Sequence, residues 1–235
     1  SYSSHKVLGS ENKSPVIIGG LFILITILIF SSLSINSKII LTFLTFLGLL
    51  SDRNILPNPK IRLVLQVIVL FLIVYIDSLK IQDLRYGPLN LLLSNNIFNV
   101  SFTVFCLAIL LNGSNFLDGL NGLVAGYYLI TIISLLILKS FYPDIVSIDN
   151  DYLKLLFFIL TVFFVFNIFG LVYLGDSGSY AIAFLIGIYL IKFYTLNPLI
   201  SPYYIAVVLW YPVFENLFSL LRRVIGKKNV STADN

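Results

Sequence analysis

Two short polar runs in this sequence contain the residue types needed to bind a charged ligand. Residues 174–179 read Leu-Gly-Asp-Ser-Gly-Ser, and residues 115–122 read Asn-Phe-Leu-Asp-Gly-Leu-Asn-Gly. Both runs lie at the end of a long apolar stretch, where a carboxylate usually has a function. Their glycines allow backbone amides to approach a ligand closely. The runs therefore predict a site in which acidic groups bind a metal and amides bind a phosphate.

Asp176 and Asp118 are the acidic residues of these runs. Asp176 precedes an apolar helix expected from about residue 180, so Asp176 or a neighbouring serine could simply cap that helix. The same geometry suits a phosphate at the helix start and Mg²⁺ on the carboxylate, and the two interpretations are compatible. Asn115, Asp118 and Asn121 recur at intervals of three, which places them on one face of a helical turn. Their oxygens suit Mg²⁺, whereas the alternative is a polar cluster that packs against other loops.

A third polar segment covers residues 51–62 and begins with Ser51 and Asp52. Two prolines stiffen it. Lys60 and Arg62 near its end can face a phosphate. The alternative is that these two cations anchor the following helix at the membrane surface.

Glu215 lies within an apolar stretch close to the C-terminus. A carboxylate inside a membrane segment indicates a functional site by default. The alternative is an ion pair with Arg222 or Arg223.

The composition indicates an all-α, polytopic membrane protein. Hydrophobic residues make up 58% of the 235 residues, and the mean hydropathy is +0.98, far outside the range of soluble domains. A single cysteine, Cys106, excludes a disulfide framework. The net charge of +4 comes from cations scattered among loops, so nucleic-acid binding has no support. The absence of an internal repeat argues against many transporter folds.

About eight membrane spans are expected, because a span needs roughly 20 apolar residues, or fewer where the bilayer thins. We predict one integral-membrane domain over residues 1–235. The chain begins at Ser1 without methionine and ends soon after a basic segment, so we also expect spans or loops to be missing at both ends. The predicted spans are 16–35, 39–50, 61–76, 97–111, 120–138, 153–169, 180–194 and 205–221.

Eight spans place both ends of the chain on the same side of the membrane. Nine of the fifteen Lys and Arg residues then lie on that side, four of them within seven residues after Leu221. Such an excess is typical of the cytoplasmic side. The segments 51–62, 112–122, 170–179 and 222–235 would therefore share the cytoplasmic face, and the predicted site would face the cytoplasm.

Five motifs in order resemble the polyprenyl-phosphate N-acetylhexosamine-1-phosphate transferases, in glycosyltransferase family 4. They begin with His5-Lys6 followed by Gly19-Gly20, and continue with residues 48–52 followed by 59–66. Residues 115–122 are similar to the family's Asn-x-x-Asp-Gly motif, and 174–179 to its Leu-Gly-Asp-Ser-Gly-Ser motif. Residues 211–215 with the later arginine pair are similar to a further signature. The shorter loops and the run Phe-Leu-Gly-Leu-Leu-Ser-Asp at residues 46–52 resemble the O-antigen or teichoic-type branch, the undecaprenyl-phosphate GlcNAc-1-phosphate transferases, more than the peptidoglycan branch.

The resemblance implies a reaction at the bacterial inner membrane. Undecaprenyl phosphate would attack the β-phosphate of a UDP-N-acetylhexosamine, releasing UMP and leaving a lipid-linked pyrophosphoryl sugar that starts a cell-envelope polysaccharide such as O-antigen or teichoic acid. Mg²⁺, with Mn²⁺ as a substitute, would be the cofactor, and a homodimer would be compatible with the family.

The resemblance also implies roles for individual residues. Asp176 and Asn115 would bind the metal, with Asp118 at the metal–pyrophosphate centre and Asn121 near the nucleotide. Asp52 would lie near the lipid phosphate and act, with Asp118 and Asp176, in catalysis. The remaining substrate-binding residues would be Ser51, Lys60, Arg62 and Glu215.

Two alternatives stay open, and departures from the family pattern motivate the first of them. The first Asp of the family's Asp-Asp pair is Ser51 here, and its basic residue before the Gly-Asp motif is Leu171. The family's histidine-rich segment does not occur before Asn235. These departures would suit a degenerate member that binds substrates without turnover. A small-solute transporter is the other alternative, although it should place its polar groups near mid-membrane.

Overall fold

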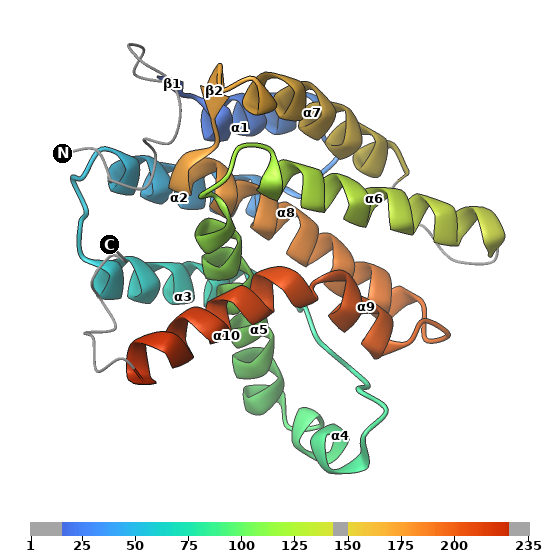
Figure 1. The fold of residues 1–235 in the computed structure, drawn as a ribbon. Helices are drawn as coiled ribbons and strands as arrows, with labels where there is room; N and C mark the ends of the chain where they lie inside the picture. The colour runs from blue at the N-terminus through green and yellow to red at the C-terminus, as the bar shows by residue number, and fades with distance from the viewer. Residues whose placement is uncertain (1–15, 143–149, 226–235) are drawn as a thin grey trace.

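The computed structural model describes residues 16–142 and 150–225, which form a bundle of helices with two very short strands (Figure 1). The strands form a parallel pair in which Val16 lies opposite Val172 and Ile17 opposite Tyr173. The elements are β1 (Val16–Ile17), α1 (Gly19–Phe30), α2 (Ile35–Asp52), α3 (Pro59–Ile76), α4 (Gly87–Leu93), α5 (Asn96–Leu117), α6 (Leu123–Phe141), α7 (Asn150–Ile168), β2 (Val172–Tyr173), α8 (Gly175–Leu196), α9 (Pro202–Val208) and α10 (Trp210–Ile225).

Helix α8 is the centre of the bundle. In its spanning segment 72% of the residues are buried, compared with 28% for α3, which therefore lies at the periphery. Helices α1, α2 and α5 pack against α8. Gly48 of α2 allows the closest approach, because a Cβ atom there would lie 2.3 Å from the Cα atom of Ser177. Small residues at the start of α8 and on α2 thus allow the two backbones to meet.

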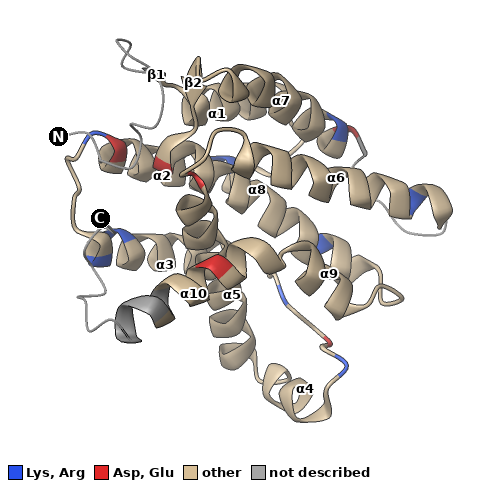
Figure 2. Cartoon of the chain, in the orientation of Figure 1, with Lys and Arg blue, Asp and Glu red and all other residues tan. Residues whose placement is uncertain are grey.

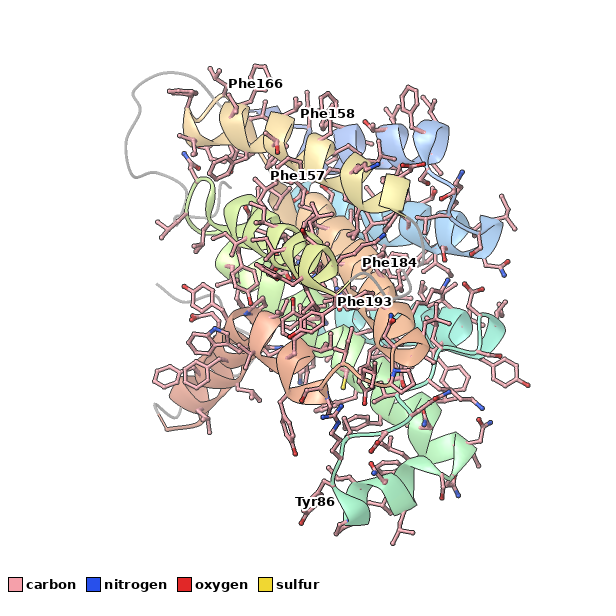
Figure 3. All side chains as sticks on the ribbon, turned by 90° about the vertical axis from the view of Figure 1, so that its right-hand side faces the viewer. Tyr86, Phe157, Phe158, Phe166, Phe184 and Phe193 are labelled. Atoms are coloured by element: carbon pink, nitrogen blue, oxygen red, sulfur yellow. The ribbon has the colours of Figure 1, made fainter. Side chains whose placement is uncertain are left out.

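The lateral surface of the bundle is apolar. On α7, Phe158 and Phe166 point outward and are 64% and 48% exposed (Figure 3). Phe184 and Phe193 of α8 lie inside the bundle and are buried. Lys, Arg, Asp and Glu lie mostly at helix ends and in loops (Figure 2). A belt of exposed aromatic and aliphatic side chains between charged ends is the surface expected in a lipid bilayer.

Six helices of the described segments are long and apolar enough to span a membrane: α2, α3, α5, α6, α7 and α8. They correspond to six of the eight expected spans, and confirm the prediction of an all-α membrane bundle. The first expected span is a helix of only 12 residues, α1. At 1.5 Å per residue α1 is about 18 Å long, shorter than a hydrocarbon core of about 30 Å.

The eighth expected span, residues 205–221, is divided between α9 and α10. Pro212 has no N–H with which to bond the carbonyl of Val208, four residues earlier, and α9 ends at Val208. The hydroxyl of Tyr127 donates to that carbonyl instead, at 2.6 Å. In α10, Asn216 is buried and donates to the carbonyl of Ile109, while Phe218 is 56% exposed. Helix α10 therefore packs its polar side against α5 and exposes its apolar side.

Three connections lie at one end of the bundle, which we call the site end: residues 53–58, 118–122 and 169–174. The buried Asn167 joins two of them. Its side-chain oxygen accepts from the amide of Gly122 at 2.6 Å, and its side-chain nitrogen donates to the carbonyl of Val172 at 2.7 Å. The α2–α3 connection joins the same end where Asp52 contacts the start of α8. Residues far apart in the sequence thus meet at the predicted site.

Gly113→Ala should destabilise the protein, although Gly→Ala within a helix normally stabilises it by up to about 1 kcal/mol. A Cβ atom at Gly113 would lie 2.0 Å from the carbonyl oxygen of Pro212, so α10 would have to move. We expect a loss of about 1–3 kcal/mol, typical of overpacking, measured as a lower midpoint of thermal unfolding in detergent. Gly87→Ala, where a Cβ atom meets nothing within 4 Å, is the matched control and should leave the midpoint unchanged. Equal midpoints for both variants would contradict the close α5–α10 contact.

Candidate active site

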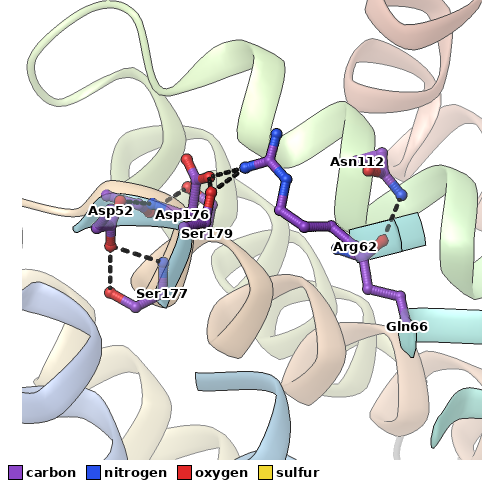
Figure 4. Close-up of polar contacts among 9 residues, drawn as sticks. Asp52, Arg62, Gln66, Asn112, Asp176, Ser177 and Ser179 are labelled. Carbon is purple, nitrogen blue, oxygen red and sulfur yellow. Dashed lines mark hydrogen bonds and ion pairs between the residues drawn. The ribbon is translucent and has the colours of Figure 1, made fainter. Parts of the chain in front are cut away.

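Asp176 lies in the first turn of α8 and accepts two side-chain hydrogen bonds on the same oxygen. Arg62 Nη1 lies 2.6 Å from Asp176 Oδ2 (Figure 4). The Ser51 hydroxyl donates to the same oxygen. The Arg62 guanidinium also contacts the Ser51 hydroxyl. The side chains of Arg62 and Asp176 are 20% and 22% exposed, so the ion pair is accessible to a ligand. The structure thus brings together three predicted site residues from α2, α3 and α8.

Asp52 contacts the backbone at the start of α8. Its Oδ1 atom accepts from the amide of Asp176 at 2.8 Å, and its Oδ2 atom accepts from the amide of Ser177 at 3.2 Å and from the Ser177 hydroxyl at 3.0 Å (Figure 4). The local interpretation that Asp176 or a nearby serine caps this helix is wrong. The N-cap residue is Leu174, without a side-chain cap bond, and the cap is supplied by Asp52 from the end of α2.

The motif 115–122 begins on a helix and continues as a turn. Helix α5 ends at Leu117, so Asn115 lies in its last turn, and Asp118 is the residue that ends it. Gly122 has a left-handed φ of 79° and precedes α6. The prediction of one helical face for all three polar residues is therefore wrong for Asn121, which lies beyond the helix end. A Cβ atom placed on Gly170 would lie 3.6 Å from Asn121 Nδ2, so Asn121 lies beside the α7–α8 connection.

Two further predicted residues, Lys60 and Glu215, lie on α3 and α10. Lys60 is exposed in the first turn of α3, two residues before Arg62, where Asn58 caps the helix by accepting from the Lys60 amide at 3.0 Å. Glu215 lies on α10, and the described side chains give it no ion pair or hydrogen bond to the Asp52–Asp176 group. The N-terminal signature at His5 and Lys6 lies outside the described residues, as do the side chains of the Arg222-Arg223 pair.

The sequence analysis missed polar residues that support the site. The side chain of Asn112 on α5 donates to the side-chain oxygen of Gln66 at 2.9 Å (Figure 4). Gln66 follows Arg62 by four residues and therefore lies on the same side of α3. Asn167, described above, fixes the connection that leads into α8. Asn167 is an isolated amide within an apolar run, and a buried amide needs partners, which was the available signal for it. Asn112 instead adjoins the polar run of Gly113, Ser114 and Asn115.

The donor atoms at Asp176 fit a divalent cation. The described residues contain no group of three or more His, Cys, Asp or Glu side chains that could hold a metal alone. Mg²⁺ usually binds one or two carboxylates together with waters and substrate phosphates, so such a group is not required. Asp52 and Asp176 carry two negative charges, and Arg62 offsets one of them. Asp52 bonds to amides, which leaves Asp176 as the carboxylate that would hold the ion.

An apolar cavity of about 580 Å³ lies between α5, α8, α9 and α10, and its walls extend from the middle of α5 and α8 toward the end of the bundle opposite the site. Its walls include Cys106 and Leu110 of α5, Tyr194 of α8, Ala206 of α9 and Phe214 of α10. The break between α9 and α10 shapes one wall. Such a cavity can bind an apolar chain but offers few groups for a polar ligand.

Comparison with known proteins identifies the family. Residues 34–194 match glycosyl transferase family 4, a range that includes the segments 51–62, 115–122 and 174–179. A probable undecaprenyl-phosphate N-acetylglucosaminyl 1-phosphate transferase of Bacillus subtilis (strain 168) is 27% identical over 194 residues, covering 80% of this chain. The chain spans 52% of the length of that relative. No solved structure matches. Because the family match covers more than half of the chain, this multi-pass membrane protein belongs to glycosyl transferase family 4.

Proposed function

We propose that the protein transfers a HexNAc-1-phosphate, with N-acetylglucosamine the favoured sugar, from a UDP-sugar to undecaprenyl phosphate. The observation that carries the proposal is the Ser51–Arg62–Asp176 cluster at the start of α8, within the part of the chain that matches the family. The Bacillus subtilis relative, whose name states such an activity, supports it. The product would start a cell-envelope polysaccharide.

In the proposed reaction an oxygen of the lipid phosphate attacks the β-phosphorus of the UDP-sugar. The bond from that phosphorus to the bridging oxygen breaks, and UMP leaves with the electron pair. Mg²⁺, when bound, would offset charge on the pyrophosphate. The protein would hold the ion through Asp176 and Asn115, with Asp118 beside the pyrophosphate and Asn121 near the nucleotide. Lys60 and Arg62 would bind phosphate oxygens, and stabilisation of this charge is the largest catalytic contribution expected.

Arg62 would change partners when the metal binds. In the structure its guanidinium neutralises Asp176. With Asp176 holding a divalent ion, Arg62 would no longer be needed as its counter-ion and could contact a substrate phosphate in a bidentate manner. Arg62 would then offset the negative charge of the Asp176 carboxylate before the metal and the substrate bind, and the negative charge of the pyrophosphate after they have bound.

The lipid acceptor is supported by the apolar cavity. Its α5 wall extends from Phe102 to Leu110, and Asn115 lies in the last turn of the same helix. A phosphate at the site end and an isoprenoid chain in the cavity would therefore lie along one helix. We further propose that the site end, which carries Arg53, Lys60 and Arg62, faces the cytoplasm, because cations close to the ends of membrane helices favour that side.

A degenerate family member remains the second candidate, because Ser51 and Leu171 replace the family's acidic and basic residues. The experiment that separates the two is UMP release by the purified protein in detergent with Mg²⁺, undecaprenyl phosphate and a set of UDP-N-acetylhexosamines. Turnover with one of these sugars supports the transferase. Binding of UDP-sugar without UMP release from any of them would support the degenerate member.

Asp176→Asn should lower UMP release by about 1000-fold or more, which corresponds to about 4 kcal/mol of lost transition-state stabilisation. The amide keeps the size of the side chain and removes the charge that would hold the metal, so the unfolding midpoint should change little. Asp83→Asn, at an exposed carboxylate in the connection between α3 and α4, is the control and should retain full activity. Normal turnover in Asp176→Asn would refute the metal assignment.

Arg62→Gln should have opposite effects on metal and substrate. Removing the cation 2.6 Å from Asp176 should tighten Mn²⁺ binding by roughly threefold to tenfold, measured by electron paramagnetic resonance of free Mn²⁺. Loss of charge-assisted bonds to phosphate should raise KM for the UDP-sugar or the lipid by about tenfold. Weaker Mn²⁺ binding in this variant would show that Arg62 supports the metal site and does not compete for Asp176.

Ala206→Trp should partly fill the apolar cavity and exclude an isoprenoid chain. We expect KM for undecaprenyl phosphate to rise about tenfold, the effect of leaving roughly two CH₂ groups unburied, with little change for a short farnesyl phosphate acceptor. Val207→Trp is the matched control, since Val207 is 67% exposed and does not line the cavity. Equal effects of Ala206→Trp on both acceptors would exclude this cavity as the tail site.

A further inference from the structure

The carboxylate of Asp52 is fully engaged with the first turn of α8. Its two oxygens accept three hydrogen bonds, from the amides of Asp176 and Ser177 and from the Ser177 hydroxyl, at 2.8 to 3.2 Å. Amides at a helix start have no partner within the helix, and the partial positive charge there favours an anion. Asp52 thus provides for the start of α8 what an N-cap side chain normally provides locally.

The packing around Asp52 holds its carboxylate in this position. Gly175 has a left-handed φ of 69°, and a Cβ atom there would lie 2.6 Å from Asp52 Oδ2. On the opposite side of the contact, a Cβ atom at Gly48 would lie 2.3 Å from the Cα atom of Ser177. The end of α2 and the start of α8 are therefore in direct backbone contact, and Asp52 lies at the end of that contact.

This position is unsuited to a general base. A base must bring an oxygen within hydrogen-bond reach of the proton that it removes, and both Asp52 oxygens face the α8 backbone. A phosphate monoester also has a second pKa of about 6, so the lipid phosphate is largely ionised at neutral pH without a base. In contrast, the adjacent Ser51 directs its hydroxyl toward Asp176 and Arg62.

We propose that Asp52 is a positioning residue that acts through Asp176. By fixing the first turn of α8, it holds the Asp176 carboxylate at the position where it contacts Ser51 and Arg62, and from which it would bind a divalent cation once Arg62 has moved away. The inference rests on the proposed function for its catalytic consequence, but its structural part concerns only the start of α8.

The test compares Asp52→Ala, Asp52→Asn and Ser177→Ala in the purified protein. Three quantities are measured: amide hydrogen exchange of residues 175–185, Mn²⁺ affinity, and kcat and KM for UMP release.

Ser177→Ala removes one of the three hydrogen bonds and should weaken Mn²⁺ binding about twofold. Asp52→Ala removes all three and should weaken Mn²⁺ binding about tenfold, the loss typical when a residue that orients a metal ligand is removed. Asp52→Asn keeps one acceptor and should lie between them. Exchange at the start of α8 should accelerate in the same order, by about fivefold in Asp52→Ala.

Asn95→Ala is the matched control. Asn95 caps α5 at the other end of the bundle by accepting from the amides of Ile97 and Phe98. Its loss should accelerate exchange at the start of α5 and leave Mn²⁺ affinity unchanged. If Asp52→Ala does not fold, the graded effects of Asp52→Asn and Ser177→Ala still decide the question.

A catalytic base would give a different pattern. Loss of kcat in Asp52→Asn with wild-type exchange and wild-type Mn²⁺ affinity would overturn the proposal. Failure of the proposed function is distinguishable, because the wild-type protein would then release no UMP while the order of exchange rates among the variants would still report on the cap.

Discussion

The start of α8 is the constraint on which the rest of the structure depends. The first amides of a helix have no partner within the helix, and each one that is buried without a partner is costly. Gly175 and Ser177 provide no side-chain cap of their own within the helix. Asp52 satisfies two of these amides from the end of α2. This contact requires α2 to approach α8 closely, which Gly48 allows.

The same contact determines which side chains reach the site. Because Asp52 is the last residue of α2 and is directed toward the α8 backbone, the preceding Ser51 lies beside the Asp176 carboxylate. Arg62 approaches from the first turns of α3, after a short connection stiffened by two prolines. The negative charges of Asp52 and Asp176 are close together, and Arg62 is the cation that offsets them in the described structure. Charge balance at the start of α8 therefore couples the α2–α3 connection to Asp176.

The sequence was sufficient for the class of fold and for the identity of most site segments. Apolar stretches predicted six spans correctly, since length and hydropathy decide whether a helix can cross a bilayer. They failed at residues 205–221, where hydropathy is continuous but Pro212 removes a backbone donor and Tyr127, from a distant helix, bonds the freed carbonyl. The number of apolar residues carries no information about that partner.

The segments that form the site could be predicted from the sequence, but the contacts between their side chains could not. The local sequence correctly placed Asp176 at a helix start, and the expected topology put Arg62 on the same membrane face, where the structure pairs the two. It could not show that Asp52 bonds the α8 backbone, because the two segments are separated by more than a hundred residues. It also placed Asn121 on a helix that ends at Leu117, since Gly122 and the turn before it redirect the chain into α6. Long-range contacts and helix ends are the properties that local patterns report least well.

Helix α5 connects the polar site to the apolar cavity. Its last turn carries Asn115, and its middle residues line the cavity about 8–20 Å away along the axis, at 1.5 Å per residue. Gly113 lies between the two regions and allows a close approach of the Pro212 carbonyl in the first turn of α10, just after the break between α9 and α10 at Leu209. This contact sets the position of α10 on α5, and α10 forms part of a wall of the cavity. If the acceptor is a polyprenyl phosphate, α5 is the element that aligns its charged end with Asp176 and its chain with the membrane interior.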